Sequence, residues 1–410
     1  MEPLRFIHAA DLHLDSPFKG MEGELPQELF ARMKESTFSS FSRIVQVAIE
    51  EKVDFVLLAG DLYDADARSI RAQLFLRNEL QRLDDHNISV FIIHGNHDHL
   101  GGSFAEIEFP SNVTVFEKDT VEYKPFYKNN QLFAYIYGFS YLQQAVLENM
   151  TSQYEKTEQA PFHIGMLHGS VEEASDHSRY APFLVRELLD KQFDYWALGH
   201  IHKRNVLYEQ PPIIYPGNIQ GRHRKETGEK GCYLVTLGPS ASYTFVSTAD
   251  VIWEEASISI DGLQYIDELL ERCYSMVKHM RRKNEGTLVI LTFTGYGELS
   301  IYLQDPKQLE EIVQLLQSQE DRQFVYVVKC YNHTLSNDAM EAMKQESHFI
   351  GELLQEVESC TYLESIVKPL WQSGVAKAID AFNEEEKEEI LQEAKRIMLR
   401  ELVAGRGDVR

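Results

Sequence analysis

Five short runs of apolar residues occupy the first 200 positions of the chain. They are LRFIHAA (4–10), VDFVLLAG (53–60), SVFIIHG (89–95), FHIGMLHG (162–169) and YWALGH (195–200). Runs of this length with few polar interruptions predict β-strands that are buried on both faces. Between the first three, residues 26–52 and 67–86 read as helices, and Pro26 is typical of a first helical turn. The βαβαβ order predicts an α/β fold with helices covering a central sheet.

The pattern changes near residue 251. Strand-like segments at 251–260, 287–297 and 324–330 alternate with a helix that ends near Arg282 and another at 306–317. From residue 336 the pattern is mostly helical, and one apolar stripe consists of Ile390, Leu391, Ala394, Ile397, Met398 and Leu402. We therefore expect a first domain at 1–250, a small α/β domain at 251–335 and a helical tail at 336–410.

Composition narrows the class of protein. The chain has 410 residues, 43% of them hydrophobic and 25% charged, with a formal net charge of −24. This excess of acid argues against binding nucleic acid by bulk electrostatics, so a polyanionic substrate would need metal ions or local basic patches. The four cysteines have no CxxC spacing, and the sequence shows neither a signal peptide nor an apolar segment of membrane-spanning length. We expect a cytoplasmic protein that does not contact membranes.

Each of the five predicted strands ends in side chains that can bind metal. In the motifs Asp11-x-His13 and His200-x-His202, residues i and i+2 of an extended segment point the same way. The other strand ends carry Asp61 in GDLYD, Asn96-His97-Asp98 in GNHD, and His168. Two carboxylates with neutral His and Asn ligands would leave two divalent ions with net positive charge, which suits an anionic phosphate. The carboxyl ends of strands are where α/β sheets form binding crevices.

The ordered set D-x-H, GD-x-x-D, GNHD, H-G and GH-x-H resembles the calcineurin-like metallophosphoesterase superfamily. Within this superfamily the sequence looks most like the SbcD-type DNA repair exonuclease branch, and within that branch like the YhaO-like bacterial proteins. The segments that carry this narrower resemblance are HAADLHLDSPF, GDLYD, GHIHK and YPGN. The resemblance implies a layered fold, a β-sheet sandwich flanked by helices, with the small α/β domain capping the active site. It covers residues 4–240 strongly.

The resemblance also implies roles for the strand-end residues. Two divalent ions would bind there, Mn²⁺ by family analogy, with Fe or Zn²⁺ also compatible with mixed N/O ligands. The nucleophile would be a metal-bound hydroxide, and His97 would protonate the leaving oxygen or steady the charge on phosphorus. One ion would be held by Asp11, His13 and His202, the other by Asn96, His168 and His200, and Asp61 would bridge them.

Asp64 and Asp98 are candidates for orienting His97 or its loop. Archaeal and eukaryotic relatives carry a histidine where Asp64 stands, whereas the bacterial branch agrees with this sequence. Ordinary hydrogen bonding within the loops is the alternative for both carboxylates. We read His8, His94, His99, His177 and His223 as histidines without a catalytic role.

Two basic runs are candidates for contacts with DNA phosphates. Arg222, Arg224 and Lys225 lie in the loop IQGRHRKETGEKG (219–231), and Arg281, Arg282 and Lys283 follow Lys278 near a predicted helix end. The alternatives are a solvated hairpin tip for the first run and a solvated helix end for the second.

The functional hypothesis is a two-metal phosphodiesterase that hydrolyses DNA as an SbcD-like exonuclease. In such proteins the C-terminal helical segment docks on the coiled coil of an SbcC-like ATPase, although the tail here could instead pack on its own chain. A homodimer is left open. The alternatives are a phosphomonoesterase or small-molecule phosphodiesterase of the same fold, and a scaffold for DNA ends or the ATPase with little turnover.

Overall fold

The computed structural model describes residues 2–64, 68–102, 107–157, 160–172, 180–317 and 323–337. The chain divides into two compact units, the first comprising 1–254, 281–288 and 319–328. The second contains the described residues of 255–280, 289–318 and 329 onwards. Among the helices of the described residues, none combines the length and apolar character needed to cross a membrane.

The first unit contains two six-stranded sheets. In the first of them the strands lie in the order β12-β11-β1-β2-β3-β4. Strands β1 to β4 run parallel to one another, and β11 pairs antiparallel with both β1 and β12. The apolar runs predicted as the first three strands form β1, β2 and β3, which confirms them. The bounds are β1 Leu4–Ala9, β2 Phe55–Ala59, β3 Ser89–Ile93, β4 Val113–Val115, β11 Gly231–Leu237 and β12 Ser242–Ser247.

A second six-stranded sheet has the order β5-β6-β7-β8-β10-β9. Its strands β6, β7, β8 and β10 are parallel, and β5 and β9 pair antiparallel at its two edges. The last two predicted strands are β7 and β8, so the five runs divide between two sheets and do not share one. The bounds are β5 Glu122–Lys128, β6 Gln131–Gly138, β7 Phe162–His168, β8 Tyr195–Gly199, β9 Asn205–Glu209 and β10 Pro212–Tyr215.

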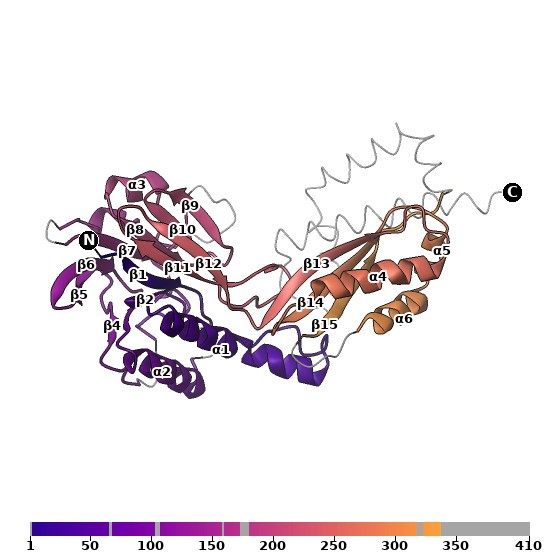
Figure 1. Ribbon diagram of the computed structural model, residues 1–410, viewed down its shortest axis with the longest axis horizontal. Coiled ribbons are helices and arrows are strands. Elements are labelled where there is room, and N and C mark those ends of the chain that lie inside the picture. Colours follow the sequence, from indigo (N-terminus) through magenta and orange to yellow (C-terminus); the bar gives the residue numbers. More distant parts are fainter. Residues whose placement is uncertain are drawn as a thin grey trace, which may run out of the picture. The chain divides into compact units, whose positions relative to one another are not determined.

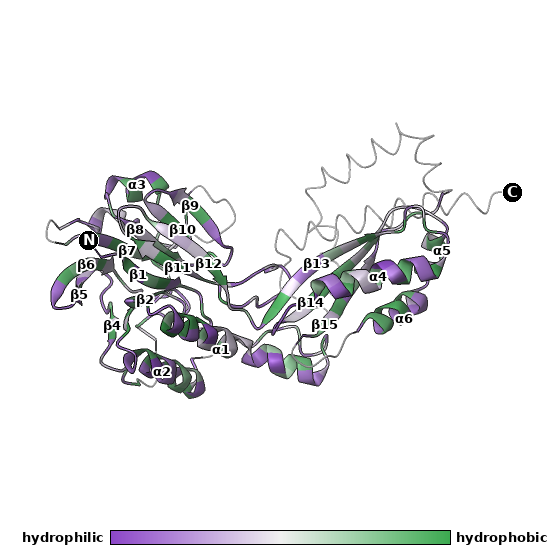
Figure 2. Cartoon of the chain, in the orientation of Figure 1, coloured by the Kyte–Doolittle hydropathy of each residue, from purple (hydrophilic) through white to green (hydrophobic). Residues whose placement is uncertain are grey.

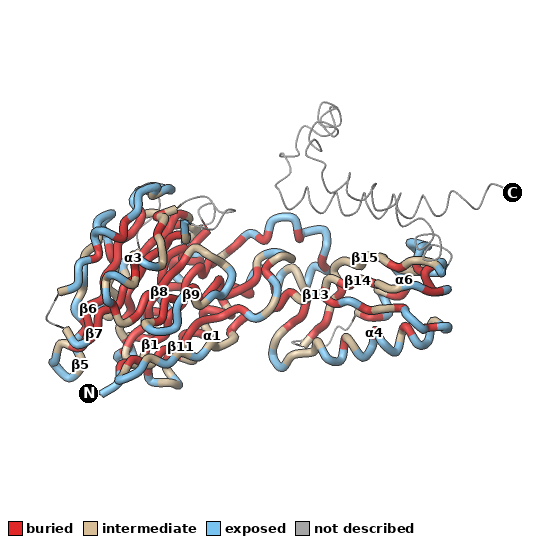
Figure 3. The backbone as a smooth tube through the Cα atoms, turned by 90° about the horizontal axis from the view of Figure 1, so that it is seen from above, coloured by how far each residue is buried: buried red, intermediate tan, exposed pale blue. Residues whose placement is uncertain are grey.

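The two sheets share one hydrophobic core, to which β1, β2 and β3 contribute from one side and β6, β7 and β8 from the other. Phe6 stacks on Phe55 with ring centroids 4.9 Å apart and meets Tyr195 of the second sheet edge-on at 5.1 Å. Figure 3 shows the buried residues concentrated along β1, β8 and β11. This packing explains why β1, β2, β3, β7 and β8 are largely apolar, because both of their faces are covered.

Helices cover the outer faces of the sandwich (Figure 1). Helices α1 (Gln27–Glu50) and α2 (Ile70–Asp84) pack on the first sheet, as predicted, with Pro26 as the N-cap of α1. Figure 2 shows both helices with alternating hydrophobic and hydrophilic stretches, as expected when one face is buried and the other is exposed. The outer face of the second sheet is covered by α3 (Val185–Asp190) and by residues around the 3₁₀ turn η2 (Thr151–Gln153). The layered α/β sandwich is thus confirmed.

The remaining described residues form a three-stranded sheet of β13 (Val251–Ser259), β14 (Gly286–Thr294) and β15 (Val325–Asn332). Its helices are α4 (Ile266–Met280), α5 (Leu299–Leu303) and α6 (Pro306–Leu316), of which α5 was not predicted. Residues at or just before the beginnings of these strands join a core of the first unit: Val251, Trp253, Leu288 and Phe324. The predicted domain boundaries stay predictions, and the tail with its apolar stripe lies outside the described residues.

Candidate metal centre

The seven predicted metal ligands lie at the carboxyl ends of β1, β2, β3, β7 and β8, where strands from both sheets meet. His168 is the last residue of β7, and the other six lie in the loops that follow the other four strands. Backbone hydrogen bonds join two of these loops: the Asp11 amide donates to Gly60 O at 3.0 Å and the His13 amide to Asp61 O at 3.1 Å. Four of the ligands have a positive backbone φ, between 41° and 97°: Asp11, His13, Asp61 and His200. Non-glycine residues adopt this left-handed region at a cost, and such strain gathers at functional sites.

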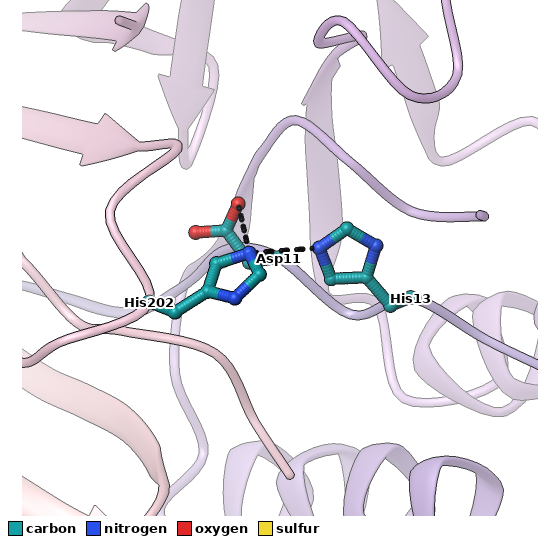
Figure 4. Close-up of side chains that lie close together, drawn as sticks. All are labelled: Asp11, His13 and His202. Carbon is teal, nitrogen blue, oxygen red and sulfur yellow. Dashed lines mark hydrogen bonds and ion pairs between the residues drawn. The ribbon is translucent and has the colours of Figure 1, made fainter. Parts of the chain in front are cut away.

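Three of the ligands form a first group, shown in Figure 4. The Nε2 atoms of His13 and His202 lie 3.0 Å apart, and Asp11 Oδ1 lies 4.0 Å from His202 Nε2. Asp11 is held in place because its carboxylate accepts the His200 amide at 3.1 Å. Burial raises the pKa of Asp11 to about 6 and lowers that of His13 to about 4.

Of the other four ligands, Asn96, His168 and His200 form a second group. Asn96 Oδ1 lies 3.1 Å from His168 Nε2 and 3.2 Å from His200 Nδ1. Asp61 stands between the groups, with Oδ2 3.4 Å from His168 Nε2 and 3.9 Å from His13 Nε2. Burial alone would raise the pKa of Asp61, but the surrounding histidines outweigh it and lower the pKa. This is the place of a bridging ligand in the predicted arrangement.

The donor and acceptor pattern fits a cation. The carbonyl oxygen of Ala59 can only accept, so His168 Nδ1, 2.9 Å away, must carry a proton and donate it. In a neutral imidazole the lone pair then sits on Nε2, which faces the acceptors Asn96 Oδ1 and Asp61 Oδ2. Burial lowers the pKa of His168, but Asp61 overcomes this and raises it to about 9. An acceptor surrounded by acceptors calls for a positive charge, supplied by a proton or a metal ion.

Glycines keep the site compact. A Cβ on Gly60 would lie 2.4 Å from His168 Nδ1, and one on Gly199 would lie 1.9 Å from Ala59 O. A Cβ on Gly95 would lie 2.4 Å from Asp61 Oδ1 and 2.6 Å from His168 Nε2. The glycines before Asp61, Asn96 and His200 are therefore required by close approach of the two sheets' loops.

His97 lies beside the two groups, 38% exposed. Its amide donates to Asp61 Oδ1 at 2.9 Å, and its ring meets the His13 ring edge-on with centroids 5.0 Å apart. Asp64 lies 3.4 Å from His97 Nδ1 and 3.1 Å from His13 Nδ1. The carboxylate of Asp64 also accepts Arg222 Nη1 at 2.8 and 2.9 Å. These contacts place Asp64 where it can orient both histidines.

Asp98 is buried behind the same loop. Its carboxylate accepts the amides of Gly95 at 2.7 Å and Leu62 at 2.9 Å, and it pairs with His94 Nδ1 at 2.9 Å. Asp98 therefore ties the loop after β3 to the loop after β2.

Glu226 is a site residue that the sequence did not single out. Its Oε1 accepts His202 Nδ1 at 2.6 Å, and Lys230 Nζ donates to the His202 carbonyl at 3.1 Å. Burial would raise the pKa of Glu226, but His202 outweighs it and lowers the pKa. In the sequence, Glu226 is one acid in the loop 219–231, and only the basic residues of this loop were candidates.

The basic candidates are placed as follows. Arg222 pairs with Asp64 inside the site, whereas Arg224 and Lys225 follow on the same loop. Arg282 pairs with Glu254 at 2.7 Å and with Glu229 at 3.5 Å, and Arg281 and Lys283 flank it. Contact of any of the six with DNA stays a prediction.

A cavity of about 370 Å³ opens beside His97 and is lined by Ser16, Pro17, Phe18, Lys19, Asp64, Gln144, Arg222 and His223.

The fold and site are those of a metal-dependent phosphoesterase, and comparison with known proteins agrees. Residues 4–204 match the family model described as calcineurin-like phosphoesterase, and the chain belongs to this family. This confirms the predicted superfamily. The family hydrolyses phosphoesters with divalent metal ions, and the Asp and His groups above are candidates for holding them.

Two relatives and one solved structure illustrate the likeness. The chain is 42% identical over 405 residues to the metallophosphoesterase YhaO of Bacillus subtilis, covering 97% of this chain and 98% of that protein. It is 24% identical over 319 residues to the DNA double-strand break repair protein Mre11 of Sulfolobus acidocaldarius, covering 70% and 76%. A dimetal phosphatase from Danio rerio has a TM-score of 0.33 and 13% identity, covering 60% of this chain and 100% of that one.

Proposed function

We propose that this protein is a two-metal phosphodiesterase that hydrolyses DNA phosphodiester bonds, as an SbcD-like exonuclease. The observation that carries the proposal is the pair of ligand groups joined by Asp61. One group converges on Asn96 Oδ1 and the other on the facing Nε2 atoms of His13 and His202. Two divalent ions bound there would polarise the phosphate and activate a water for in-line attack.

The chain's own residues supply the rest of the chemistry. Asp61 bridges the groups and fixes the loop of His97 through the His97 amide. The partly exposed ring of His97 can reach a substrate oxygen and give it a proton as it leaves. Asp64 holds His97 from the side, and Arg222 sets the position of Asp64.

DNA as the substrate is supported by likeness to a protein named for DNA double-strand break repair and by the basic loop at 222–225. A coiled-coil ATPase of the SbcC type is the proposed partner, through the C-terminal tail. Manganese as the metal and the cytoplasm as the location belong to the same proposal, and a homodimer remains open.

The experiment is Mn²⁺-dependent cleavage of end-labelled duplex DNA by the purified chain, beside hydrolysis of bis-(p-nitrophenyl) phosphate. His97→Ala should reduce cleavage of DNA by about 10²- to 10⁴-fold while Mn²⁺ still binds, because proton transfer to the leaving sugar oxygen is lost. Hydrolysis of bis-(p-nitrophenyl) phosphate should fall much less, because p-nitrophenolate leaves without needing a proton. Asp61→Ala should abolish hydrolysis and weaken Mn²⁺ binding, because the bridge between the groups is gone.

The same assay separates the alternatives. Cleavage of the small diester alone would favour a small-molecule phosphodiesterase, for which the 370 Å³ cavity beside His97 is the supporting observation. DNA binding without metal-dependent hydrolysis of either substrate would contradict the proposal and favour a scaffold.

A further inference from the structure

A buried carboxylate, that of Glu226, joins the loop 218–226 to the metal centre. Glu226 is 8% exposed, and both of its oxygens have partners. Oε1 accepts His202 Nδ1 at 2.6 Å and lies 3.5 Å from His223 Nε2. Oε2 accepts the Arg222 amide at 2.6 Å and Asn218 Nδ2 at 2.8 Å. One side chain therefore contacts a candidate metal ligand and the backbone of the residue that pairs with Asp64.

The contact with His202 fixes which ring nitrogen faces the metal centre. Since a carboxylate can only accept, His202 Nδ1 donates and its Nε2 lone pair points toward His13 and Asp11. Carboxylates that hold a metal-binding histidine in this way raise its basicity and fix its orientation. The second group is oriented differently, because His168 donates to the backbone carbonyl of Ala59. A side-chain substitution can thus loosen one metal position and spare the other.

The contact with Arg222 fixes the start of the basic loop. The Arg222 amide donates to Glu226, while its guanidinium holds the carboxylate of Asp64. Asp64 in turn lies beside His13 and His97. Gly221 leaves room for this return of the chain, because a Cβ there would lie 2.8 Å from the Glu226 carbonyl oxygen.

We propose that Glu226 is a positioning residue that holds both the metal ligand His202 and the backbone of Arg222, so that loading of one metal position and placement of the Arg222 side chain depend on the same carboxylate. This inference rests on the proposed function, because it needs metal ions at the two groups. It assigns Glu226 no contact with substrate.

The test measures Mn²⁺ binding to the metal-stripped full chain by calorimetry, together with the kinetics of bis-(p-nitrophenyl) phosphate hydrolysis. In Glu226→Ala one of two Mn²⁺ ions should bind about 10- to 100-fold more weakly and the other as in the wild type. In Glu226→Gln the one remaining acceptor oxygen can face either His202 or the pair formed by the Arg222 amide and Asn218, but not both sides. Either Mn²⁺ affinity or KM should therefore change, and less than in the alanine variant.

Glu229→Ala is the matched control, because Glu229 lies three residues after Glu226, is 44% exposed and pairs with Arg282 outside the metal centre. It should bind two ions as the wild type does. Two ions bound with wild-type affinity by Glu226→Ala would overturn the inference. If thermal unfolding shows that the alanine variant does not fold, wild-type affinity and KM in Glu226→Gln would overturn it equally. A wild-type chain that binds no Mn²⁺ would instead refute the proposed function.

Discussion

Adding one methyl group at Gly95 should disable the metal centre without changing a charge or a ligand. A Cβ at this position would lie 2.4 Å from Asp61 Oδ1 and 2.6 Å from His168 Nε2, whereas ordinary contact begins at 3.4 Å. Asp61 and His168 would have to move by about 1 Å, and misplacement on this scale costs about 100-fold in rate. Gly95 is not among the residues with positive φ, so alanine fits the backbone and the effect comes from contact alone.

The assay is Mn²⁺-dependent hydrolysis of bis-(p-nitrophenyl) phosphate by Gly95→Ala, with Mn²⁺ binding and urea unfolding measured on the same protein. We expect turnover to fall about 100-fold and the free energy of unfolding to fall by about 1 to 3 kcal/mol from overpacking. Gly23→Ala is the control, since a Cβ there meets nothing within 4 Å. It should keep full activity. Wild-type turnover and Mn²⁺ affinity in Gly95→Ala would refute the proposed packing of Asp61 and His168.

Three further predictions concern stability. Burial lowers the pKa of His8 to about 3. Between pH 6.5 and 3 the unfolded chain therefore binds one more proton at His8 than the folded chain, so lowering the pH below 6.5 should reduce the free energy of unfolding, by about 2 kcal/mol at pH 5. His8→Asn should make the free energy of unfolding in urea depend less on pH across that range. An unchanged pH dependence would contradict this. Asp250→Asn should lower the free energy of unfolding by about 3 kcal/mol, because the 10% exposed carboxylate pairs with Arg32 and Arg43. Glu51→Gln removes a charge from a more exposed pair, in which Glu51 is 45% exposed, and should lower it by under about 1 kcal/mol. Equal losses in the two variants would be evidence against this difference. Removing metal with a chelator should lower the temperature of half-unfolding of the wild type, since each ion present at 100 times its Kd adds about 2.7 kcal/mol to the free energy of unfolding. The same treatment should lower it less in Asp61→Ala. Equal shifts in the two proteins would argue against metal binding at Asp61.

Strands buried on both faces were the most predictable part of the fold. β1, β2, β3, β7 and β8 lie within the five apolar runs, and α1 begins right after Pro26. Strands such as β9 and β12 were missed, because their residues are mostly exposed or half-buried and carry no long apolar run. β11 was missed although five of its seven residues are buried.

The candidate site shows the same division. The seven proposed ligands could be selected because each lies at the carboxyl end of an apolar strand or just after it, where binding crevices form. Asp64 could be named, but its partner Arg222 lies 158 positions away in the sequence. Glu226 could not be found at all, since a glutamate among basic loop residues resembles any solvated acid until its burial is known.

The sequence by itself determined the fold class, the family and the chemical types of the site, because apolar periodicity and the spacing of His, Asp and Asn are local properties. Only the tertiary structure decided that three of the five strands belong to one sheet and two to the other. It also decided that one carboxylate serves both His202 and Arg222. These relations depend on packing between segments far apart in the chain, and no local pattern encodes which buried face meets which.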